Sequence, residues 1–402
     1  MKQVKLGIIG MGNMGSAHFK GIIDQANCEI VVTAIADRLD AKIEAIKTHL
    51  DNFNQTHPER QIATPAVFKE GSDLIESGEC EAILIAVPHY DHPTLAIQAF
   101  RKGLHVMCEK PAGVYTLQVR EMMDEADKHP ELKFGMMFNQ RTNCLYRKMK
   151  EIIDSGELGE IRRTNWIVTD WYRPQNYYDS GDWRATWAGE GGGVLLNQCP
   201  HNLDLWQWIC GMPVKIDAKM NFGRLHDVEI EDEVTAYVEY SNGATGCFVT
   251  TTGEAPGVNR FEIVCDGGTL ICEDNKLVLK KLSMFESEFS KTNKKSVFGK
   301  PGCTVSVVET DGLNLQHRAV RDAFAAAILR DEPMIADGRE GINGLMISNG
   351  MHLSAWTGKM VELPFDEQQF KDLLMEHVKT SKLKTTTVTS EAVDLSGTYG
   401  SK

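Results

Sequence analysis

The stretch "GIIGMGNMG" at residues 7–15 constrains the fold more than any other part of this sequence. It ends an apolar, β-branched run, places glycines in a G-x-G-x-x-G pattern, and opens a helical pattern. A second apolar run, "EIVVTAIAD" (29–37), ends in an acid 22 residues after the last of these glycines. This context predicts a strand–turn–helix unit that binds the pyrophosphate of a dinucleotide at a helix N-terminus.

Three glycines and one acid are expected to form the centre of this site. Gly10 would allow the tight turn, Gly12 the approach of the pyrophosphate, and Gly15 the close packing of the helix. Asp37 is expected to accept hydrogen bonds from the adenosine ribose and to repel a 2′-phosphate, which favours NAD over NADP. Arg38 favours NADP, since a guanidinium can hold such a phosphate. The expected cofactor is NAD.

The first 140 residues alternate apolar runs with helical patterns, which predicts a doubly wound parallel α/β sheet. The runs are continuous rather than alternating, as in strands covered on both faces. The predicted strands are residues 4–10, 29–37, 81–88, 105–110 and 133–139.

From about Tyr146 the pattern changes to alternating segments between residues 160 and 282, with an Asn-Gly turn at 242–243. These segments predict an open, mainly antiparallel sheet, followed by helices at 314–331 and 341–356. The expected organisation is a Rossmann domain at 1–140, a substrate-binding and oligomerisation domain at 141–380, and a tail at 381–402.

Composition excludes several classes of partner. The formal net charge of -13 argues against nucleic acid and anionic membranes. No run of about 18 apolar residues could span a membrane, and the first residues lead directly into a strand without an apolar leader. The ten cysteines include no C-x-x-C pair, which is typical of reduced thiols. A cytoplasmic protein with a small-molecule partner is expected.

The segment "EGGGVLLNQCPHNLDLW" (190–206) carries the strongest candidate for acid–base chemistry. On a helix, Asn197, His201 and Asp204 would share one face. Because proline is tolerated only in a first turn, Pro200 places the helix start near Asn197. Asn197 is then either the N-cap or a substrate contact, and His201 is either a buried structural histidine or a general base.

The loop "DWYRPQNYYDSGDWRATW" (170–187) is rich in aromatic residues. Aromatic faces stack on the C–H faces of sugar rings, and polar edges bond the hydroxyls. Tyr172 and Trp183 are the leading candidates for sugar contact, with Arg184 as a hydroxyl partner. The alternative is a cluster in the core or at an oligomer interface.

Two further motifs are expected to bind no metal and to take no part in catalysis. "HYDH" (89–92) has only two histidines, three residues apart, and no third ligand nearby, so no metal is expected and lining of the cofactor explains the motif better. The acidic run "EIEDE" (229–233) is most simply a solvated strand start.

Taken together, the glycine fingerprint, "VPHYDHP" (87–93), "EKP" (109–111) and the GGG…N-x-x-x-H-x-x-D segment (191–204) resemble the Gfo/Idh/MocA oxidoreductases. That family includes glucose–fructose oxidoreductase and inositol 2-dehydrogenase. The resemblance implies a Rossmann domain followed by an α/β domain whose open sheet often forms the oligomer interface, hence a homodimer or homotetramer. It also implies oxidation or reduction of a hydroxyl on a sugar or cyclitol.

The same resemblance implies residue roles. Lys110 would lie at the substrate hydroxyl, His201 would be the catalytic histidine, and His317 would lie on the substrate side. Position 197 is commonly Asp in the family, so Asn197 leaves the acid–base work to His201 with Lys110 beside it. The other residues expected to bind or line the cofactor are Asn13, Met14, Val87, Pro88, His92, Glu109 and Asn139.

The function expected from the sequence is NAD-dependent oxidation of a ring hydroxyl of a sugar, glycoside or anhydro-sugar to a ketone. Position C3 is favoured because the aromatic loop and residues 189–206 resemble levoglucosan-type dehydrogenases within the family. The alternatives are an inositol dehydrogenase, a glycosidase that uses NAD through a transient 3-keto intermediate, and a nucleotide sensor without turnover.

Overall fold

The computed structural model describes residues 2–384 and divides the chain into two compact units. The division differs from the contiguous one expected from the sequence, because a late segment clusters with the N-terminal sheet. The first unit is Met1–Thr142 with Leu315–Leu345, and the second is Asn143–Asn314 with Met346–Lys402. Most of the expected tail, residues 385–402, lies outside the described residues.

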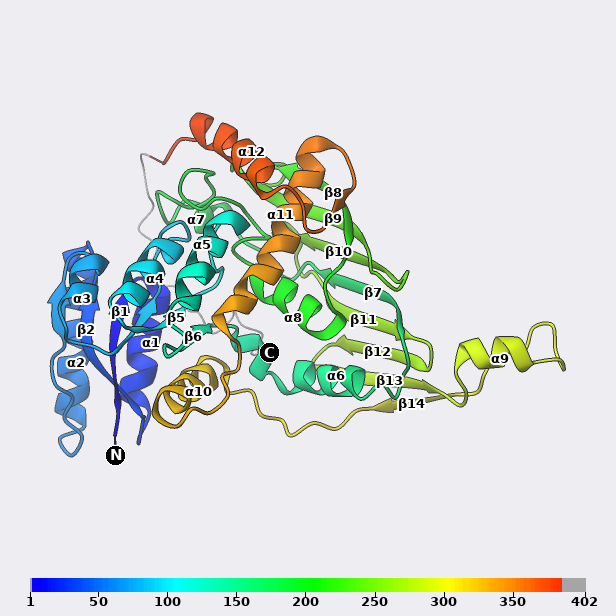
Figure 1. The fold of residues 1–402 in the computed structure, drawn as a ribbon, viewed down its shortest axis with the longest axis horizontal. Helices are drawn as coiled ribbons and strands as arrows, with labels where there is room; N and C mark the ends of the chain where they lie inside the picture. Colours follow the sequence, from blue (N-terminus) through cyan, green and yellow to red (C-terminus); the bar gives the residue numbers. More distant parts are fainter. Residues whose placement is uncertain (1, 385–402) are drawn as a thin grey trace. The chain divides into compact units, whose positions relative to one another are not determined.

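The first unit contains a six-stranded sheet in the order β3-β2-β1-β4-β5-β6, and every strand pair is parallel (Figure 1). The predicted doubly wound parallel sheet is confirmed. Its strands are β1 (Val4–Ile9), β2 (Ile30–Ala36), β3 (Ala66–Phe68), β4 (Ala82–Ile85), β5 (His105–Cys108) and β6 (Phe134–Met136). Its helices are α1 (Asn13–Asp24), α2 (Asp40–Thr56), α3 (Gly71–Glu76), α4 (Asp91–Arg101), α5 (Thr116–Asp127), η1 (Asn139–Thr142), α10 (Gln316–Arg330) and η2 (Gly338–Glu340).

Helix α10 belongs to this unit because its apolar face completes the core of the N-terminal sheet. Val320 and Phe324 are buried in the same cluster as Ile8 of β1 and Phe19 of α1. The chain order reverses between β1 and β4, and ligands of such sheets bind where the strands at this point end. The glycine turn follows β1 directly and so lies at that position.

The second unit contains a nine-stranded sheet in the order β14-β13-β12-β11-β7-β10-β9-β8-β15. It is mainly antiparallel, as predicted, with β7 and β10 the parallel pair. Its strands are β7 (Ile161–Val168), β8 (Lys215–Phe222), β9 (Glu231–Glu239), β10 (Thr245–Thr251), β11 (Asn259–Cys265), β12 (Gly268–Glu273), β13 (Lys276–Leu282), β14 (Cys303–Val307) and β15 (Val361–Glu362). Its helices are α6 (Cys144–Asp154), α7 (Gln175–Tyr178), α8 (Pro200–Cys210), α9 (Glu286–Thr292) and α12 (Glu367–Thr380), and most of α11 (Gly341–Thr357).

One face of this sheet is buried beneath helices that include α6 and α8 (Figure 1). Trp166 of β7 stacks on Phe261 with ring centroids 4.1 Å apart, and Trp206 of α8 stacks on Phe248 at 5.3 Å. Along β9 the burial alternates, so that Tyr237 on the opposite face is exposed. The predicted Asn-Gly turn joins β9 to β10, and Gly243 has a φ of 84°.

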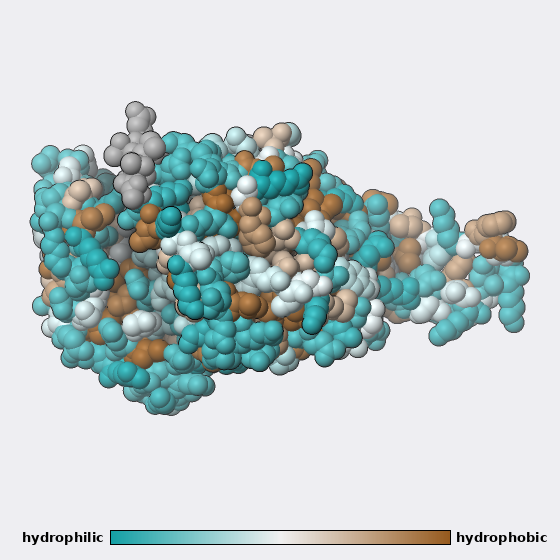
Figure 2. All heavy atoms as spheres, turned by 90° about the horizontal axis from the view of Figure 1, so that it is seen from above, coloured by the Kyte–Doolittle hydropathy of each residue, from teal (hydrophilic) through white to brown (hydrophobic). Residues whose placement is uncertain are grey.

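Residues 276–307, which we call the arm, comprise β13, α9 and β14; the two strands pair at one edge of this sheet, and α9 with its flanking loops extends beyond them (Figure 1). No residue of α9 or β14 is buried. Val297 and Phe298 in the loop after α9 are 94% and 96% exposed, and Figure 2 shows apolar surface at the far end of this arm.

Within residues 2–384, no helix has the length and apolar character needed to cross a bilayer. All ten cysteines are free thiols.

Candidate active site

The glycine turn after β1 forms a cradle at the start of α1. A side chain at Gly10 would collide with the Ala86 carbonyl oxygen, and Gly10 has a φ of 91°. A side chain at Gly15 would collide with the Gly10 carbonyl oxygen. The space beside Gly12 is open, and α1 begins at Asn13 and Met14 without a side-chain cap. This shape fits a pyrophosphate group, because backbone can approach it closely and the helix N-terminus favours an anion.

Asp37 lies beside this cradle at the end of β2. Its carboxylate accepts hydrogen bonds from Met11 N at 2.7 Å and from Leu39 N at 2.8 Å. The neighbouring Arg38 points to Glu70, and its Nε lies 2.9 Å from a Glu70 carboxylate oxygen. The guanidinium that favours NADP is therefore paired with an acid in this structure.

The other predicted cofactor residues of the first unit differ in their surroundings. Val87 lies next to Gly10, whereas Pro88 is exposed at the end of the same loop. His92 is buried and bridges two loops, with Nδ1 2.7 Å from the Pro111 carbonyl oxygen and Nε2 2.8 Å from the Val87 carbonyl oxygen. His92 therefore joins the loop after β4 to the loop after β5 through these two backbone carbonyl groups.

The EKP tripeptide follows β5. Glu109 is 4% exposed, and its carboxylate accepts hydrogen bonds from Lys110 N at 3.1 Å and from His18 Nε2 at 2.7 Å. His317, the predicted substrate-side residue, packs edge-on against His18 with ring centroids 5.3 Å apart. Burial, together with the charges of Arg321 and Lys110, lowers the pKa of His317 to about 3, so His317 is neutral near pH 7.

Asn139 also lies in this region. It is buried at the start of η1, and its amide donates to Gln316 at the start of α10. The first unit thus brings together Asn139, Glu109, Lys110 and His317 around the first turn of α10.

In the second unit, α8 begins at Pro200, which occupies the first helical turn as expected. The predicted start near Asn197 was wrong by three residues, because residues 193–199 form a turn before the helix. The N-cap is Cys199, so Asn197 is neither a cap nor on the face of α8 that carries His201 and Asp204. His201 lies in the first turn of α8 and is 4% exposed.

Asn197 is part of a polar cluster. Its amide donates to Glu190, and its carbonyl oxygen lies 3.4 Å from the Tyr177 hydroxyl. That hydroxyl also accepts from Arg184 at 3.0 Å and from Gln198 at 3.2 Å. Burial raises the pKa of Glu190, although Arg184 and the hydrogen bonds to this carboxyl act in the opposite direction.

The aromatic loop separates into two groups. Tyr178 and Trp187 are buried and belong to the packing of the unit. Arg184 lies over the rings of Tyr177 and Trp183, 4.7 Å and 4.5 Å from their centroids. Tyr172, the other predicted sugar contact, is 48% exposed at the start of the loop.

Two adjacent acids at the start of β9 hold these loops in place. The expectation that residues 229–233 are solvated was wrong for Glu231 and Asp232, which are both fully buried. Glu231 accepts hydrogen bonds from Gly193 N at 2.8 Å and Leu195 N at 3.0 Å, and its carboxylate lies 3.0 Å from His352 Nε2. This carboxylate fixes the turn that leads into the His201 helix.

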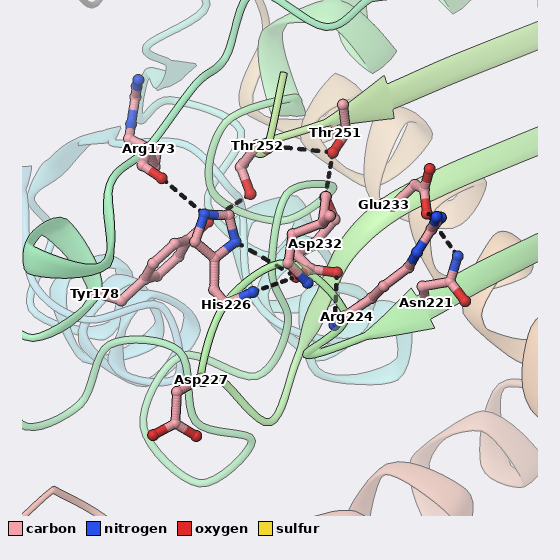
Figure 3. A network of polar contacts seen from close by, with 12 residues as sticks. Arg173, Tyr178, Asn221, Arg224, His226, Asp227, Asp232, Glu233, Thr251 and Thr252 are labelled. Atoms are coloured by element: carbon pink, nitrogen blue, oxygen red, sulfur yellow. Dashed lines mark hydrogen bonds and ion pairs between the residues drawn. The ribbon is translucent and has the colours of Figure 1, made fainter. Parts of the chain in front are cut away.

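Asp232 fixes the loop between β8 and β9 in the same way, by accepting hydrogen bonds from its backbone (Figure 3). Its carboxylate accepts from Leu225 N at 2.7 Å and His226 N at 3.1 Å. His226 in turn contacts the Arg173 carbonyl oxygen at 2.8 Å, and its ring packs against Tyr178 at 4.9 Å. The start of β9 therefore positions both the glycine segment and the aromatic loop.

Replacing Glu231 with Gln is expected to lower the free energy of unfolding by about 1–3 kcal/mol, because an amide cannot accept both N–H bonds and also face His352. Burial lowers the pKa of His352, but the Glu231 charge outweighs it and the net pKa is raised. The ion-pair contribution is thus complete below the unfolded histidine pKa of about 6.5 and is lost as pH rises through the folded pKa. Thermal and urea unfolding between pH 5.5 and 9 would measure this effect.

The control for this prediction is Glu233→Gln on the same strand, where the carboxylate is partly exposed. An equal loss of unfolding free energy in Glu233→Gln and Glu231→Gln would contradict the role assigned to Glu231. So would a difference in unfolding free energy between wild type and Glu231→Gln that grows as pH rises.

Sequence reasoning missed several residues of these clusters, including Glu190, Glu231 and Arg321. Tyr177 belonged to the aromatic loop expected to contact sugar, but Tyr172 and Trp183 were the leading candidates there. His18, three residues after Gly15 on the helix that opens the fingerprint, had a signal. Glu231 and Arg321 had none, because their partners are distant in the sequence. The partner of Glu190 is Asn197, seven residues later, but no local pattern marks that pair.

Comparison with protein families gives two matches that follow the two sheets. A model described as an oxidoreductase family with an NAD-binding Rossmann fold matches residues 4–136. A model described as the GFO/IDH/MocA C-terminal domain matches residues 146–271. The matched regions include the glycine cradle, the EKP tripeptide and His201.

Among curated relatives, the chain is 27% identical to the rhizopine catabolism protein MocA of Rhizobium meliloti, over 52% of this chain and 58% of that protein. It is 24% identical to levoglucosan dehydrogenase of Pseudarthrobacter phenanthrenivorans, over 67% of this chain and 74% of the relative. Among solved structures, the WlbA dehydrogenase of Bordetella pertussis in complex with NADH and UDP-GlcNAcA has the same fold. Its TM-score is 0.75 at 23% identity, covering 91% of this chain and 99% of that one.

Proposed function

Because the chain belongs to the Gfo/Idh/MocA oxidoreductases, a family with an NAD-binding Rossmann fold, we propose that it oxidises a ring hydroxyl of a sugar, glycoside or anhydro-sugar to a ketone. The observation that carries this proposal is the cluster before α8. There Asn197, Tyr177 and Arg184 offer an amide, a phenol and a guanidinium beside the indole of Trp183. These are the groups that recognise sugar hydroxyls and ring faces.

The catalytic roles follow from the chemistry of alcohol oxidation. The hydroxyl proton must pass to a base, and His201, four residues after Asn197, is the residue proposed for that role. The ammonium of Lys110 would stabilise the negative charge that develops on the oxygen. Bound NAD supplies the hydride acceptor, which no side chain can provide, and the cradle at Gly10, Gly12 and Gly15 would hold its pyrophosphate.

We propose position C3 of a glucose-like ring as the site of oxidation, supported by the named similarity to a levoglucosan dehydrogenase. The test is a panel of monosaccharides, inositols, anhydro-sugars and aryl glycosides incubated with NAD, with absorbance at the NADH band and product NMR as readouts. Stoichiometric NADH with a 3-keto product supports the proposal. Release of the aglycone without NADH would identify the glycosidase, and oxidation confined to inositols would identify the inositol dehydrogenase.

Cofactor preference is expected to depend on Asp37. Replacing Asp37 with Ser should weaken NADH binding roughly 10- to 100-fold, since a charge-assisted hydrogen bond to ribose contributes about 1.5–3 kcal/mol. NADPH binding should weaken less or improve, because the repulsion of its 2′-phosphate is removed. Fluorescence titration of both nucleotides measures the ratio, with Asp40→Ser, an exposed acid on α2, as control. An unchanged NADH-to-NADPH ratio would overturn the role given to Asp37.

We also propose that the protein is a homo-oligomer held in part by the arm at residues 276–307. The arm has seven lysines and two glutamates, whereas the chain as a whole has a net charge of -13, so a second copy offers complementary charge. Replacing Val297 and Phe298 together with Ser is expected to lower the mass measured by light scattering without lowering the melting temperature. An unchanged mass would reject this contact.

The proposed location is the cytoplasm, since ten free thiols suit a reducing compartment.

A further inference from the structure

A buried chain of hydrogen bonds joins α10, α1 and the EKP loop within the first unit. Arg321 NH1 of α10 lies 3.0 Å from Nδ1 of His18 on α1. Nε2 of the same ring lies 2.7 Å from the Glu109 carboxylate, which accepts from Lys110 N at 3.1 Å through its other oxygen. Arg321, His18 and Glu109 are each 5% exposed or less. A buried network of polar groups holds its side chains in one arrangement when each group has a hydrogen-bond partner.

The chemistry of the donors decides which atom donates and which accepts in each of these hydrogen bonds. A guanidinium has no acceptor, so Nδ1 of His18 must accept, and the ring proton must be on Nε2. The ring then donates to Glu109. Burial and the charge of Arg321 lower the pKa of His18, although Glu109 acts in the opposite direction, and this agrees with a neutral ring. Glu109 therefore remains an anion beside Lys110.

We propose that His18 and Arg321 are positioning residues that fix the Glu109 carboxylate and, through it, the loop that carries Lys110. They would act on the orientation and charge of the lysine without touching the sugar. The Lys110 charge interacts with the Glu109 carboxylate of its own loop and with His317 of α10. Since moving an anion away from an ammonium lowers the pKa of that ammonium, the position of the Glu109 carboxylate affects the charge of Lys110.

The test compares two replacements of His18. Gln can donate through its amide nitrogen and accept through its oxygen, so His18→Gln can preserve both hydrogen bonds, whereas His18→Leu removes both. Arg321→Met leaves Nδ1 of His18 without its donor. The matched control is His49→Leu, because His49 is a partly buried histidine on α2 that takes no part in these hydrogen bonds.

The first readout does not require turnover. In protein without nucleotide, the pH dependence of Lys110 acetylation by acetic anhydride, read by peptide mass spectrometry, reports the pKa of the lysine. His18→Leu is expected to lower this pKa by about one unit, because the paired carboxylate is displaced or protonated. Arg321→Met also removes a positive charge, which by itself raises the pKa of a nearby lysine, so its effect is expected to be smaller than that of His18→Leu. His18→Gln and His49→Leu should match the wild type.

The second readout rests on the proposed function. His18→Leu is expected to reduce kcat at least about tenfold with KM for the sugar within about threefold, since a displaced catalytic group costs rate more than binding. His18→Gln should restore most of kcat. Equal losses in His18→Leu and His18→Gln that follow their melting temperatures, or an unchanged Lys110 titration in His18→Leu, would overturn the proposal. If no sugar is oxidised by the wild type, the proposed function fails while the titration still decides this inference.

Discussion

Replacing His201 with Ala is expected to reduce kcat roughly 10²- to 10⁴-fold, the usual contribution of a positioned general base. The binding of NADH should be unaffected, because the cradle lies on the first unit and His201 on the second. The melting temperature should change little, since the Glu231 contacts hold the turn before α8, and Pro200 rather than the imidazole favours the start of the helix. Steady-state formation of NADH with the sugar identified by the panel measures the effect.

Added imidazole provides the control for this prediction, because a small base can enter the space left by the side chain. Partial recovery of kcat with imidazole, and none in the wild type, would identify proton transfer as the lost step. A His201→Ala variant that retains more than about a third of wild-type kcat would exclude His201 as the base.

Replacing Lys110 with Met is expected to reduce kcat about 10²- to 10³-fold, because the ammonium is the charge proposed to stabilise the developing alkoxide. Met keeps the length and apolar character of the stem, so the loop after β5 should remain folded. Lys110→Arg keeps the charge in a different shape and should recover part of the loss. The measurement is kcat and KM for the sugar in both variants.

A rise in KM with unchanged kcat in Lys110→Met would show that the lysine only binds substrate, contrary to the proposed role. A sensor without turnover would lose no biological activity in this variant.

Local patterns were sufficient to predict the N-terminal sheet and the glycine cradle. The strands of a parallel sheet are continuous apolar runs, and the fingerprint depends on residues close together in the sequence. The short strand β3 was missed, because three residues such as Ala66–Phe68 carry no period. The Asn-Gly hairpin was predicted because its turn chemistry is contained in two residues.

Features that depend on distant contacts could not be predicted. The pattern of α10 shows an apolar face but does not say which core that face joins, so Val320 and Phe324 were placed with the wrong unit. Glu231 and Asp232 look solvated in sequence because their partners are backbone N–H groups of other loops. Asn197 was expected within the helix that begins at Pro200, and instead lies in the turn before it, bonded to Glu190.

A crystal structure with bound NAD and the sugar found by the panel would show whether the two proposed catalytic groups meet at one hydroxyl. We expect His201 Nε2 and Lys110 Nζ both to lie within about 3 Å of one ring hydroxyl oxygen. A complex in which either group is more than about 5 Å from that oxygen, with the sugar bound in a productive pose, would contradict it.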